Sequence, residues 1–265
     1  MRWSWWLDGL TSEAHMTAYY NEIDPYAAQW LRNLIAAGHI APGDVDERSI
    51  EDVCPSDLTG YTQCHFFAGV GVWSLALRRA GWPDDVPVWT GSCPCQPFST
   101  AGKGAGFADE RHLWPSFHWL IQECRPAIVA GEQVASKDAD AWVDLVQADL
   151  EALGYAFGAV PFPSAGVGAP HIRDRLYWLA CAPHAYLARL PRAIRGGTTG
   201  SPDVASAWRA IERIHAKGIW PTWISESGAP ALVDGAPSRV GRLRAYGNAI
   251  NAEAARIFIQ AAMNA

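Results

Sequence analysis

Short apolar runs alternate along this chain with longer segments in which apolar residues recur every three or four positions. Runs of the first kind are typical of buried strands, and segments of the second kind are typical of amphipathic helices. The predicted strands are 18–21, 64–67, 86–90, 127–130, 155–160 and 175–181, and the predicted helices are 25–37, 72–80, 112–124, 138–153 and 249–263. This alternation predicts an α/β fold built on a doubly wound, mostly parallel sheet.

Polar and turn-forming residues interrupt the pattern in two places. The segment after Pro42 carries several acidic residues and is predicted as a loop that leads to a short element at 50–53. Between 183 and 235, loops rich in Pro, Gly and Thr surround one predicted helix, 203–217. We therefore divide the chain into a flexible extension at 1–17, a main domain at 18–182, a small irregular insert at 183–235 and a C-terminal segment at 236–265 that returns to the main domain. The sequence leaves open whether Met1 or Met16 is the start.

The composition is that of a globular protein, because 265 residues can bury a full core. No apolar run approaches the roughly 18 residues of a membrane span, and nothing resembles a secretory leader, so we expect a cytoplasmic protein that does not bind membranes. In that compartment the six cysteines are expected to be free thiols. Their spacing does not suit a zinc site, so no metal is expected.

Charge is distributed unevenly along the chain. The net charge is −6, yet residues 171–265 hold twelve basic and six acidic side chains, whereas residues 1–60 hold three basic and ten acidic ones. Contact with phosphates needs a local basic surface rather than a basic protein. The last third of the chain is therefore the expected nucleic-acid surface, unless its arginines only keep the protein soluble.

A nucleophile is predicted in the loop that follows the strand at 86–90. Cys95 lies there between Pro94 and Gln96, in a Pro-, Gly- and Ser-rich segment that cannot continue the sheet. Open α/β sheets bind their ligands at the carboxyl ends of their strands. Most lone cysteines are small buried hydrophobic residues, but this position favours a reactive thiol.

The segment GSCPCQPFSTAGKGAGF, which begins at Gly91, resembles the catalytic motif of the DNA cytosine-5 methyltransferases. Four further pieces resemble other motifs of that family: FFAGVG at 66–71, GEQV at 131–134, HIRDR at 171–175 and YGNAI at 246–250. The resemblance implies a Rossmann-like methyltransferase fold, transfer of a methyl group from S-adenosylmethionine to C5 of cytosine, and double-stranded DNA as partner. It also implies that the insert at 183–235 recognises the target, and we expect a monomer.

The resemblance assigns a set of residues to the cofactor. Phe67 would stack on the adenine, the backbone of the glycine turn would hold the methionine part, and Glu22 would accept hydrogen bonds from the ribose. A glycine turn after a strand suits this role because the backbone can approach a ligand closely. The full set of expected cofactor residues is Phe67, Ala68, Gly69, Gly71, Glu22, Asp44, Val45, Pro94 and Asn248.

The order of these motifs differs from the usual order in the family, in which the acidic and aspartate motifs follow the glycine-rich one. Here YNEID at 20–24 resembles the acidic motif and GDV at 43–45 the aspartate motif, and both precede it. We predict that the second and third strand–helix units come before the first along the chain. Such a permutation preserves a fold, because strands meet in space whatever their order. The alternative is an unrelated N-terminal cap.

The implied reaction assigns roles to four catalytic residues. Cys95 would add to C6 of the base, and Glu132 would hydrogen-bond or protonate N3 as charge builds on the ring. Arg173 and Arg175, two apart on a predicted strand, would lie on one side of it and orient the carboxyl group and the base. Because C6 is inaccessible inside a duplex, the target must be flipped out. The loop 99–109 is expected to close over the base, and the expected substrate-binding residues are Gln96, Ser99 and Lys103.

Two positions depart from the family pattern, Gln133 in place of asparagine and His171 in place of glutamine. Neither change removes a reacting group. Two other functions stay open on the sequence alone: methylation of cytosine in RNA, and a catalytically silent protein that binds DNA or S-adenosylmethionine.

Overall fold

The computed structural model describes residues 18–94, 113–135, 137–169, 173–182 and 249–263. Within these residues the chain forms one seven-stranded sheet with the strand order β2-β1-β3-β4-β5-β7-β6. The strands are β1 (Ala18–Asn21), β2 (Gly43–Asp46), β3 (Gln63–Phe66), β4 (Val88–Gly91), β5 (Ile128–Val134), β6 (Ala156–Pro161) and β7 (Arg175–Cys181).

Most neighbouring strands run parallel. The pairs β1–β2, β1–β3, β3–β4 and β4–β5 are parallel, and β7 lies antiparallel between β5 and β6. The structure therefore confirms the predicted α/β class with a mostly parallel sheet. The last residues of four parallel strands are in register at one edge: Asn21, Asp46, Phe66 and Gly91.

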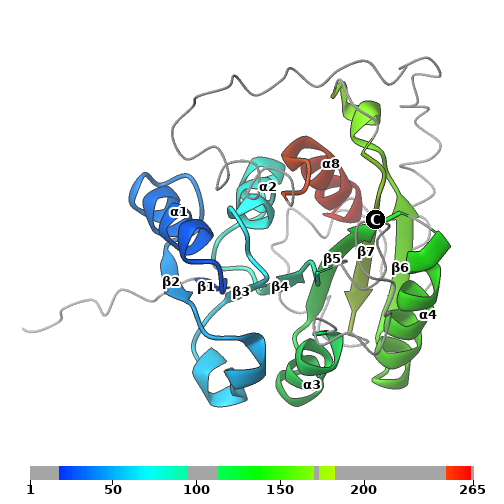
Figure 1. Cartoon of the computed structure of the whole chain (residues 1–265), viewed down its shortest axis with the longest axis horizontal. Coiled ribbons are helices and arrows are strands. Elements are labelled where there is room, and N and C mark those ends of the chain that lie inside the picture. The colour runs from blue at the N-terminus through cyan, green and yellow to red at the C-terminus, as the bar shows by residue number, and fades with distance from the viewer. Residues whose placement is uncertain (1–17, 95–112, 136, 170–172, 183–248, 264–265) are drawn as a thin grey trace, which may run out of the picture.

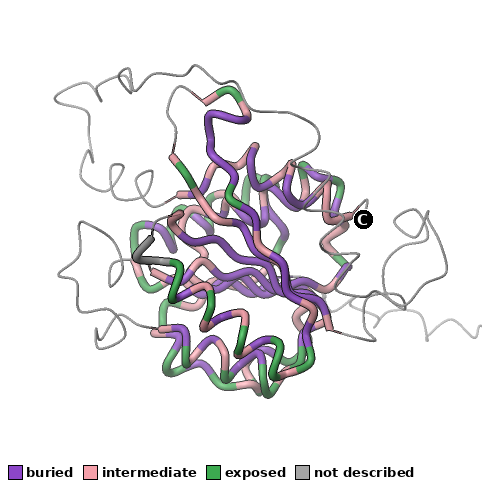
Figure 2. The backbone as a smooth tube through the Cα atoms, turned by 90° about the vertical axis from the view of Figure 1, so that its right-hand side faces the viewer, coloured by how far each residue is buried: buried purple, intermediate pink, exposed green. Residues whose placement is uncertain are grey.

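Helices cover both faces of the sheet. On one face lie α1 (Pro25–Ala36), α2 (Val72–Ala80) and α8 (Ala252–Met263), and on the other lie α3 (Trp114–Cys124) and α4 (Lys137–Ala152) (Figure 1). Short 3₁₀ turns occur at η1 (Ile50–Asp52), η2 (Pro55–Leu58) and η5 (Ser164–Val167). The strands are buried along most of their length between the two layers (Figure 2). In the part of the chain that is described, no helix combines the length and the apolar character needed to cross a bilayer.

Side-chain caps explain where two helices begin. The Asp24 carboxylate accepts hydrogen bonds from the backbone N–H of Tyr26 and Ala27 at 2.9 and 3.1 Å, and Pro25 occupies the first turn of α1. The Asn251 side chain caps α8 in the same way. The predicted start of the last helix at residue 249 was therefore too early. The predicted helix 203–217 lies outside the described residues.

The structure corrects the sequence prediction at β2 and at β5. Residues 43–46, predicted as a loop, form the edge strand β2, which has no apolar run because all four residues are only partly buried. Gly43 is required there, because a Cβ atom at this position would lie 1.8 Å from the carbonyl oxygen of Ala18. The strand predicted at 127–130 continues to Val134, so Glu132 lies within β5 rather than after it.

Two large clusters of buried side chains make the core. The α3 and α4 face is packed with aromatic rings, including Phe66, Trp114, Phe117, Trp142 and Trp178. On the opposite face, α2 and α8 pack against the sheet, where Tyr177 of β7 contacts Trp73 and Phe258. The α8 helix is therefore part of the main core.

His65 on β3 is a buried titratable group in this core. Its side chain is 1 % exposed, Nδ1 lies 2.8 Å from the Thr90 hydroxyl, and Nε2 has no partner among the described residues. Burial lowers the pKa of His65 to about 3. The imidazole is therefore neutral in the folded protein at pH 7.

The buried His65 predicts an acid-sensitive stability. Because its folded pKa lies below the ordinary value of 6.5, the unfolded chain takes up the proton first as the pH falls. Its contribution is complete above pH 6.5 and declines from there toward pH 3, by about 1.4 kcal/mol per pH unit. Urea unfolding of His65→Gln should show a shallower loss of stability between pH 6 and about pH 4. The exposed His39→Gln variant should keep the slope of the unmodified protein, and an unchanged slope in His65→Gln would contradict this assignment.

Candidate active site

The turn between β3 and α2 has an unusual backbone. Gly69 and Gly71 have φ values of 56° and 76°, and Phe67 has a φ of 52°, which is rare for a residue with a side chain. The Gly71 N–H closes the turn by donating to the Ala68 carbonyl at 2.9 Å, and α2 begins at the next residue. Strained residues of this kind gather at ligand sites. The Phe67 ring is partly buried and packs edge-on against Phe117.

Glu22 connects this turn to the end of β1. Its Oε2 accepts a hydrogen bond from the Gly69 N–H at 2.6 Å, and its Oε1 accepts one from the Asp24 N–H at 2.9 Å. Burial raises the pKa of the Glu22 carboxyl, and these two hydrogen bonds oppose the rise. The structure thus brings together Glu22 and the glycine turn, although 47 positions separate Glu22 from Gly69 in the sequence.

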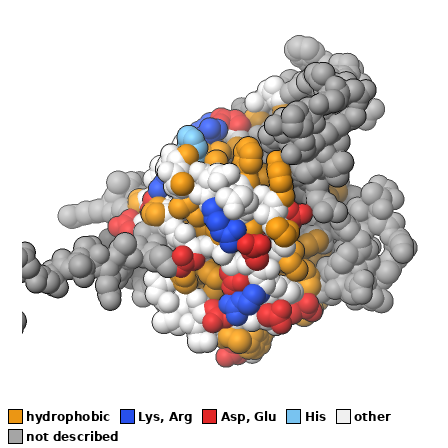
Figure 3. Space-filling view, turned by 60° about the vertical axis from the view of Figure 1, so that its left-hand side comes forward, with side chains coloured by type: hydrophobic (Ala, Val, Ile, Leu, Met, Phe, Trp, Pro, Cys, Tyr) orange, Lys and Arg blue, Asp and Glu red, His pale blue; other side chains and the backbone are white. Residues whose placement is uncertain are grey.

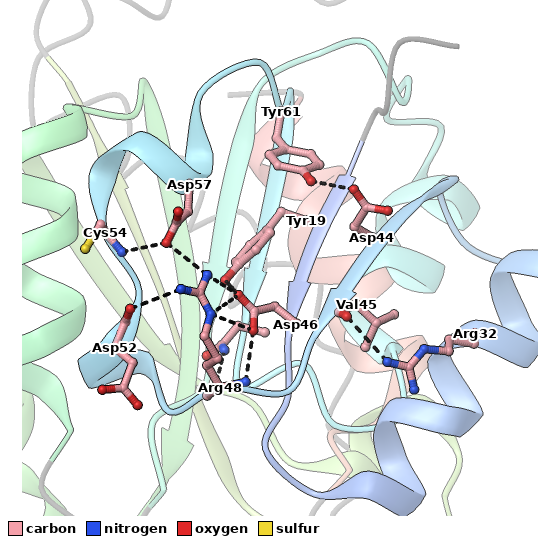
Figure 4. A network of polar contacts seen from close by, with 11 residues as sticks. Tyr19, Arg32, Asp44, Val45, Asp46, Arg48, Asp52, Cys54, Asp57 and Tyr61 are labelled. Atoms are coloured by element: carbon pink, nitrogen blue, oxygen red, sulfur yellow. Dashed lines mark hydrogen bonds and ion pairs between the residues drawn. The ribbon is translucent and has the colours of Figure 1, made fainter. Parts of the chain in front are cut away.

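Asp44 and Val45 lie within β2, before its last residue. Asp44 pairs with Tyr19, two residues before the end of β2, and its carboxylate accepts a 2.5 Å hydrogen bond from the Tyr61 hydroxyl (Figure 4). The Val45 carbonyl accepts a hydrogen bond from Arg32. The role assigned to these two residues stays a prediction.

The acidic residue at the end of β2 is Asp46. Its carboxylate accepts a 2.7 Å hydrogen bond from the Tyr19 hydroxyl and pairs with Arg48, which also reaches Asp57 (Figure 4). Arg48 therefore fastens the segment after β2 to η2. No motif points to Asp46 or Arg48, and the only signal in the sequence is the group of acidic and basic residues around 46–57.

The strand β4 ends close to this turn and leads toward Cys95. Cys93 is buried, and burial raises the pKa of its thiol, which agrees with a packing role. Pro94 is the last described residue before the gap. Cys95, Gln96, Ser99, Lys103 and Asn248 lie outside the described residues, as does His171, so their roles also stay predictions.

Glu132 is a buried acid in β5, one residue after Gly131, where the pairing with β4 ends. It is 7 % exposed, and its Oε1 lies 2.5 Å from Arg175 Nε. Burial raises the pKa of the Glu132 carboxyl, whereas the cations of Arg175 and Arg173 and a hydrogen bond from Ser92 lower it, and the net direction is upward. A carboxyl group in this state can hold a proton at a higher pH than an exposed one.

The two arginines are arranged differently from the prediction. Arg175 is the first residue of β7, but Arg173 precedes the strand with a φ of 40°, so the two do not share one side of a strand. Both still act on Glu132, because the cations of both lower its pKa. Arg173 also donates a 2.6 Å hydrogen bond to the Ala249 carbonyl, which links this corner to the start of α8.

Gln133, the residue next to Glu132, faces the other side of the sheet, since side chains alternate along a strand. Its Oε1 accepts a hydrogen bond from the Val134 N–H, and its Nε2 has no partner among the described residues. The Gln133 side chain therefore does not lie beside the Glu132 carboxyl group.

Sequence reasoning missed Ser92 and Trp73, which approach this site. The Trp73 indole donates to the Ser92 hydroxyl at 3.0 Å, and Ser92 hydrogen-bonds to Glu132. The available signal was weak: Trp73 looks like one more apolar residue of α2, and Ser92 like a turn residue after β4.

Close packing at Gly91 predicts that a side chain at this position destabilises the protein. A Cβ atom there would lie 2.4 Å from Phe117 Cε1, so Gly91→Ala should lower the free energy of unfolding by about 1–3 kcal/mol. Adding Phe117→Leu should return part of that loss, because the ring is the obstacle. Urea unfolding of the two single variants and the double variant measures this coupling, and strictly additive effects would contradict it.

Comparison with known proteins shows which family part of the chain resembles. Residues 78–187 match the family model described as C-5 cytosine-specific DNA methylase. The Type II methyltransferase M.HhaI of Haemophilus parahaemolyticus is 33% identical over 167 residues, which cover 48% of this chain and 51% of that protein. M.NlaX of Neisseria lactamica is 28% identical over 206 residues, covering 76% of this chain and 56% of that protein.

Among solved structures, a DNMT2 variant of Spodoptera frugiperda aligns with a TM-score of 0.43 and 17% identity, covering 64% of this chain and 43% of that one. The chain spans about half the length of the two curated relatives named above. Residues 78–187 thus resemble the C-5 cytosine-specific DNA methylase family, and the two Type II methyltransferases are similar to this chain over about half of their own length.

Proposed function

We propose that this protein transfers a methyl group from S-adenosylmethionine to C5 of a cytosine in double-stranded DNA, through a covalent adduct between Cys95 and C6. The observation that carries the proposal is the buried Glu132 carboxyl, held by Arg175 at the same sheet edge as the glycine turn. A buried acid with a raised pKa beside a ligand-binding edge is a typical functional group. The match of residues 78–187 to the family model described as C-5 cytosine-specific DNA methylase supports DNA as the substrate.

The residues at the turn fit S-adenosylmethionine. Each oxygen of Glu22 accepts one backbone hydrogen bond, which leaves lone pairs for ribose hydroxyls. The positive φ values at 67, 69 and 71 hold the backbone in a tight turn where a ligand can approach it closely. Phe67 is partly exposed there and can stack on an adenine. Pro94, Asp44, Val45 and Asn248 complete the proposed cofactor set.

The order of the strands supports the proposed permutation. β1 and β2 come before β3 in the chain, yet they lie beside it on the sheet in the order β2-β1-β3. Glu22, at the end of β1, therefore reaches the turn that follows β3. An unrelated N-terminal cap would not need parallel pairing with β3 in the same sheet.

The chain's own residues supply the activation of the base. Cytosine C5 is a poor nucleophile, and addition of the Cys95 thiolate to C6 moves electron density toward C5. Glu132 gives a proton or a hydrogen bond to N3, where negative charge builds. S-adenosylmethionine, when bound, supplies the electrophilic methyl group. Loss of the C5 proton to a base and departure of the Cys95 thiolate then restore the ring.

Access to C6 requires that the base leave the duplex. We propose that the loop 99–109 closes over the flipped base, with Gln96, Ser99 and Lys103 in contact with DNA. The insert at 183–235 and the basic last third would face the phosphates. On the described side shown in Figure 3, Lys and Arg side chains lie beside Asp and Glu side chains, so their charges are mixed. That side is therefore a poor surface for phosphates.

Covalent trapping tests the substrate and the nucleophile. Duplex DNA or RNA that contains 5-fluorocytosine should form a denaturation-resistant adduct with this protein and S-adenosylmethionine, because fluorine at C5 cannot leave as a proton does. We expect the adduct with DNA, its loss in Cys95→Ala, and its retention in Cys54→Ala, which removes an exposed free thiol. Gel electrophoresis after denaturation measures it. An adduct with RNA alone would reassign the substrate, and no adduct with either polymer would favour a silent binding protein.

The proposed donation of a proton from Glu132 to N3 predicts the effect of Glu132→Gln. Glutamine keeps the shape but cannot give up a proton, so methyl transfer should fall by about 100-fold or more while S-adenosylmethionine still binds. Transfer of a labelled methyl group to DNA and calorimetric titration of the cofactor measure the two effects. The exposed Glu123→Gln is the matched control and should keep full activity. Undiminished transfer in Glu132→Gln would remove this residue from the mechanism.

A further inference from the structure

A chain of hydrogen bonds runs from the cofactor-side helix to Glu132. Trp73 lies in the first turn of α2, two residues after Gly71, and is 5 % exposed. Its Nε1 lies 3.0 Å from the Ser92 hydroxyl, in the segment directly after β4. Ser92 follows Gly91, which pairs with Gly131 in the β4–β5 register, so it lies next to Glu132, and a hydrogen bond from its hydroxyl lowers the pKa of that carboxyl group. Three elements, α2, the end of β4 and β5, thus meet at one hydroxyl group.

The direction of these hydrogen bonds follows from the chemistry of the groups. An indole N–H can only donate, so the Ser92 oxygen accepts from Trp73. The hydroxyl hydrogen is then directed away from the indole and is free to donate to the Glu132 carboxylate. Hydrogen bonds in such a series polarise and strengthen one another in a buried site. Ser92 is therefore a better donor to the carboxylate than an isolated serine.

The remaining groups around Glu132 hold it from other sides. Arg175 contacts Oε1 at the start of β7, and the Arg173 cation acts on the same carboxyl group. Tyr177 is opposite Glu132 in the β5–β7 register and packs edge-on against the Trp73 ring, with 6.0 Å between centroids. The arginines hold the carboxyl group from the β7 side, and only Ser92 among these groups connects it to α2 through a hydrogen bond.

We propose that Trp73 and Ser92 are positioning residues for the methyl-transfer reaction, in which they hold the Glu132 carboxyl group toward the base and couple it to the helix that begins at the cofactor turn. This inference rests on the proposed function. Neither residue touches the reacting atoms, and each acts through Glu132. We call the hydrogen-bonded series from Trp73 through Ser92 to Glu132 the relay. It requires only a hydroxyl group at 92 and an indole N–H at 73.

The test removes one donor at a time. Ser92→Ala removes the hydroxyl group, and Ser92→Thr keeps it. Trp73→Phe removes the indole N–H and keeps an aromatic ring. The matched control is Trp82→Phe, because Trp82 is also buried and donates at 3.0 Å to the Val86 carbonyl, outside the relay. The readouts are kcat and KM for S-adenosylmethionine across pH, and the pH midpoint of the carboxyl C=O infrared band that disappears in Glu132→Gln.

The expected results follow from the loss of a donor to the carboxylate. Without the hydroxyl group, the infrared midpoint and the alkaline limb of the kcat profile of Ser92→Ala should move to higher pH. Its maximal kcat should fall about tenfold with KM unchanged, because the carboxyl group is less well held. Trp73→Phe should show smaller changes in the same direction. Ser92→Thr and Trp82→Phe should behave like the unmodified protein.

Other outcomes would overturn the relay. An unshifted infrared midpoint and an unchanged kcat in Ser92→Ala would show that the hydroxyl group does not act on Glu132. Equal decreases of kcat in Trp73→Phe and Trp82→Phe would mean that both variants lower kcat through a general loss of packing. If the unmodified protein transfers no methyl group but the midpoint shifts as expected in Ser92→Ala, the relay stands and the proposed function fails.

Discussion

A carboxyl group buried at the edge of a sheet lowers stability unless cations and hydrogen bonds surround it. Glu132 meets this condition because β7 runs antiparallel to β5 and brings Arg175 to its side chain. Arg173 adds a second cation and ties the same corner to the residue that precedes α8 by three positions. The placement of the acid therefore depends on the pairing of β5 with β7, and the proposed chemistry depends on the acid.

The glycine turn is joined to the sheet by a different contact. Glu22 accepts the Gly69 N–H and so joins the end of β1 to the turn after β3. The same turn starts α2, whose Trp73 reaches the segment after β4 through Ser92. The glycine turn and the buried acid are consequently parts of one connected arrangement at the carboxyl edge. A shift of the backbone at the glycine turn can therefore move the Glu132 carboxyl group through the packed and hydrogen-bonded groups between them.

Sequence patterns predicted the class of the fold and several parts of the site for clear physical reasons. Apolar periodicity located most strands and helices, and the resemblance to the motifs of a known family singled out Glu22, the glycine turn and Glu132. Apolar periodicity did not predict strand β2, because the exposed faces of an edge strand carry polar residues such as Asp44 and Asp46. It also failed for the left-handed backbone of Arg173 and for the contact of Trp73 with Ser92, which depend on how distant segments pack.

The most direct test of this account is a crystal structure of the protein with a duplex that contains 5-fluorocytosine and with the demethylated cofactor. The account predicts a bond between Cys95 Sγ and C6 of an extruded base, with the Glu132 carboxyl group within hydrogen-bond distance of N3 and still in contact with Arg175. A base that is bound elsewhere, with Glu132 facing no part of its ring, would contradict it.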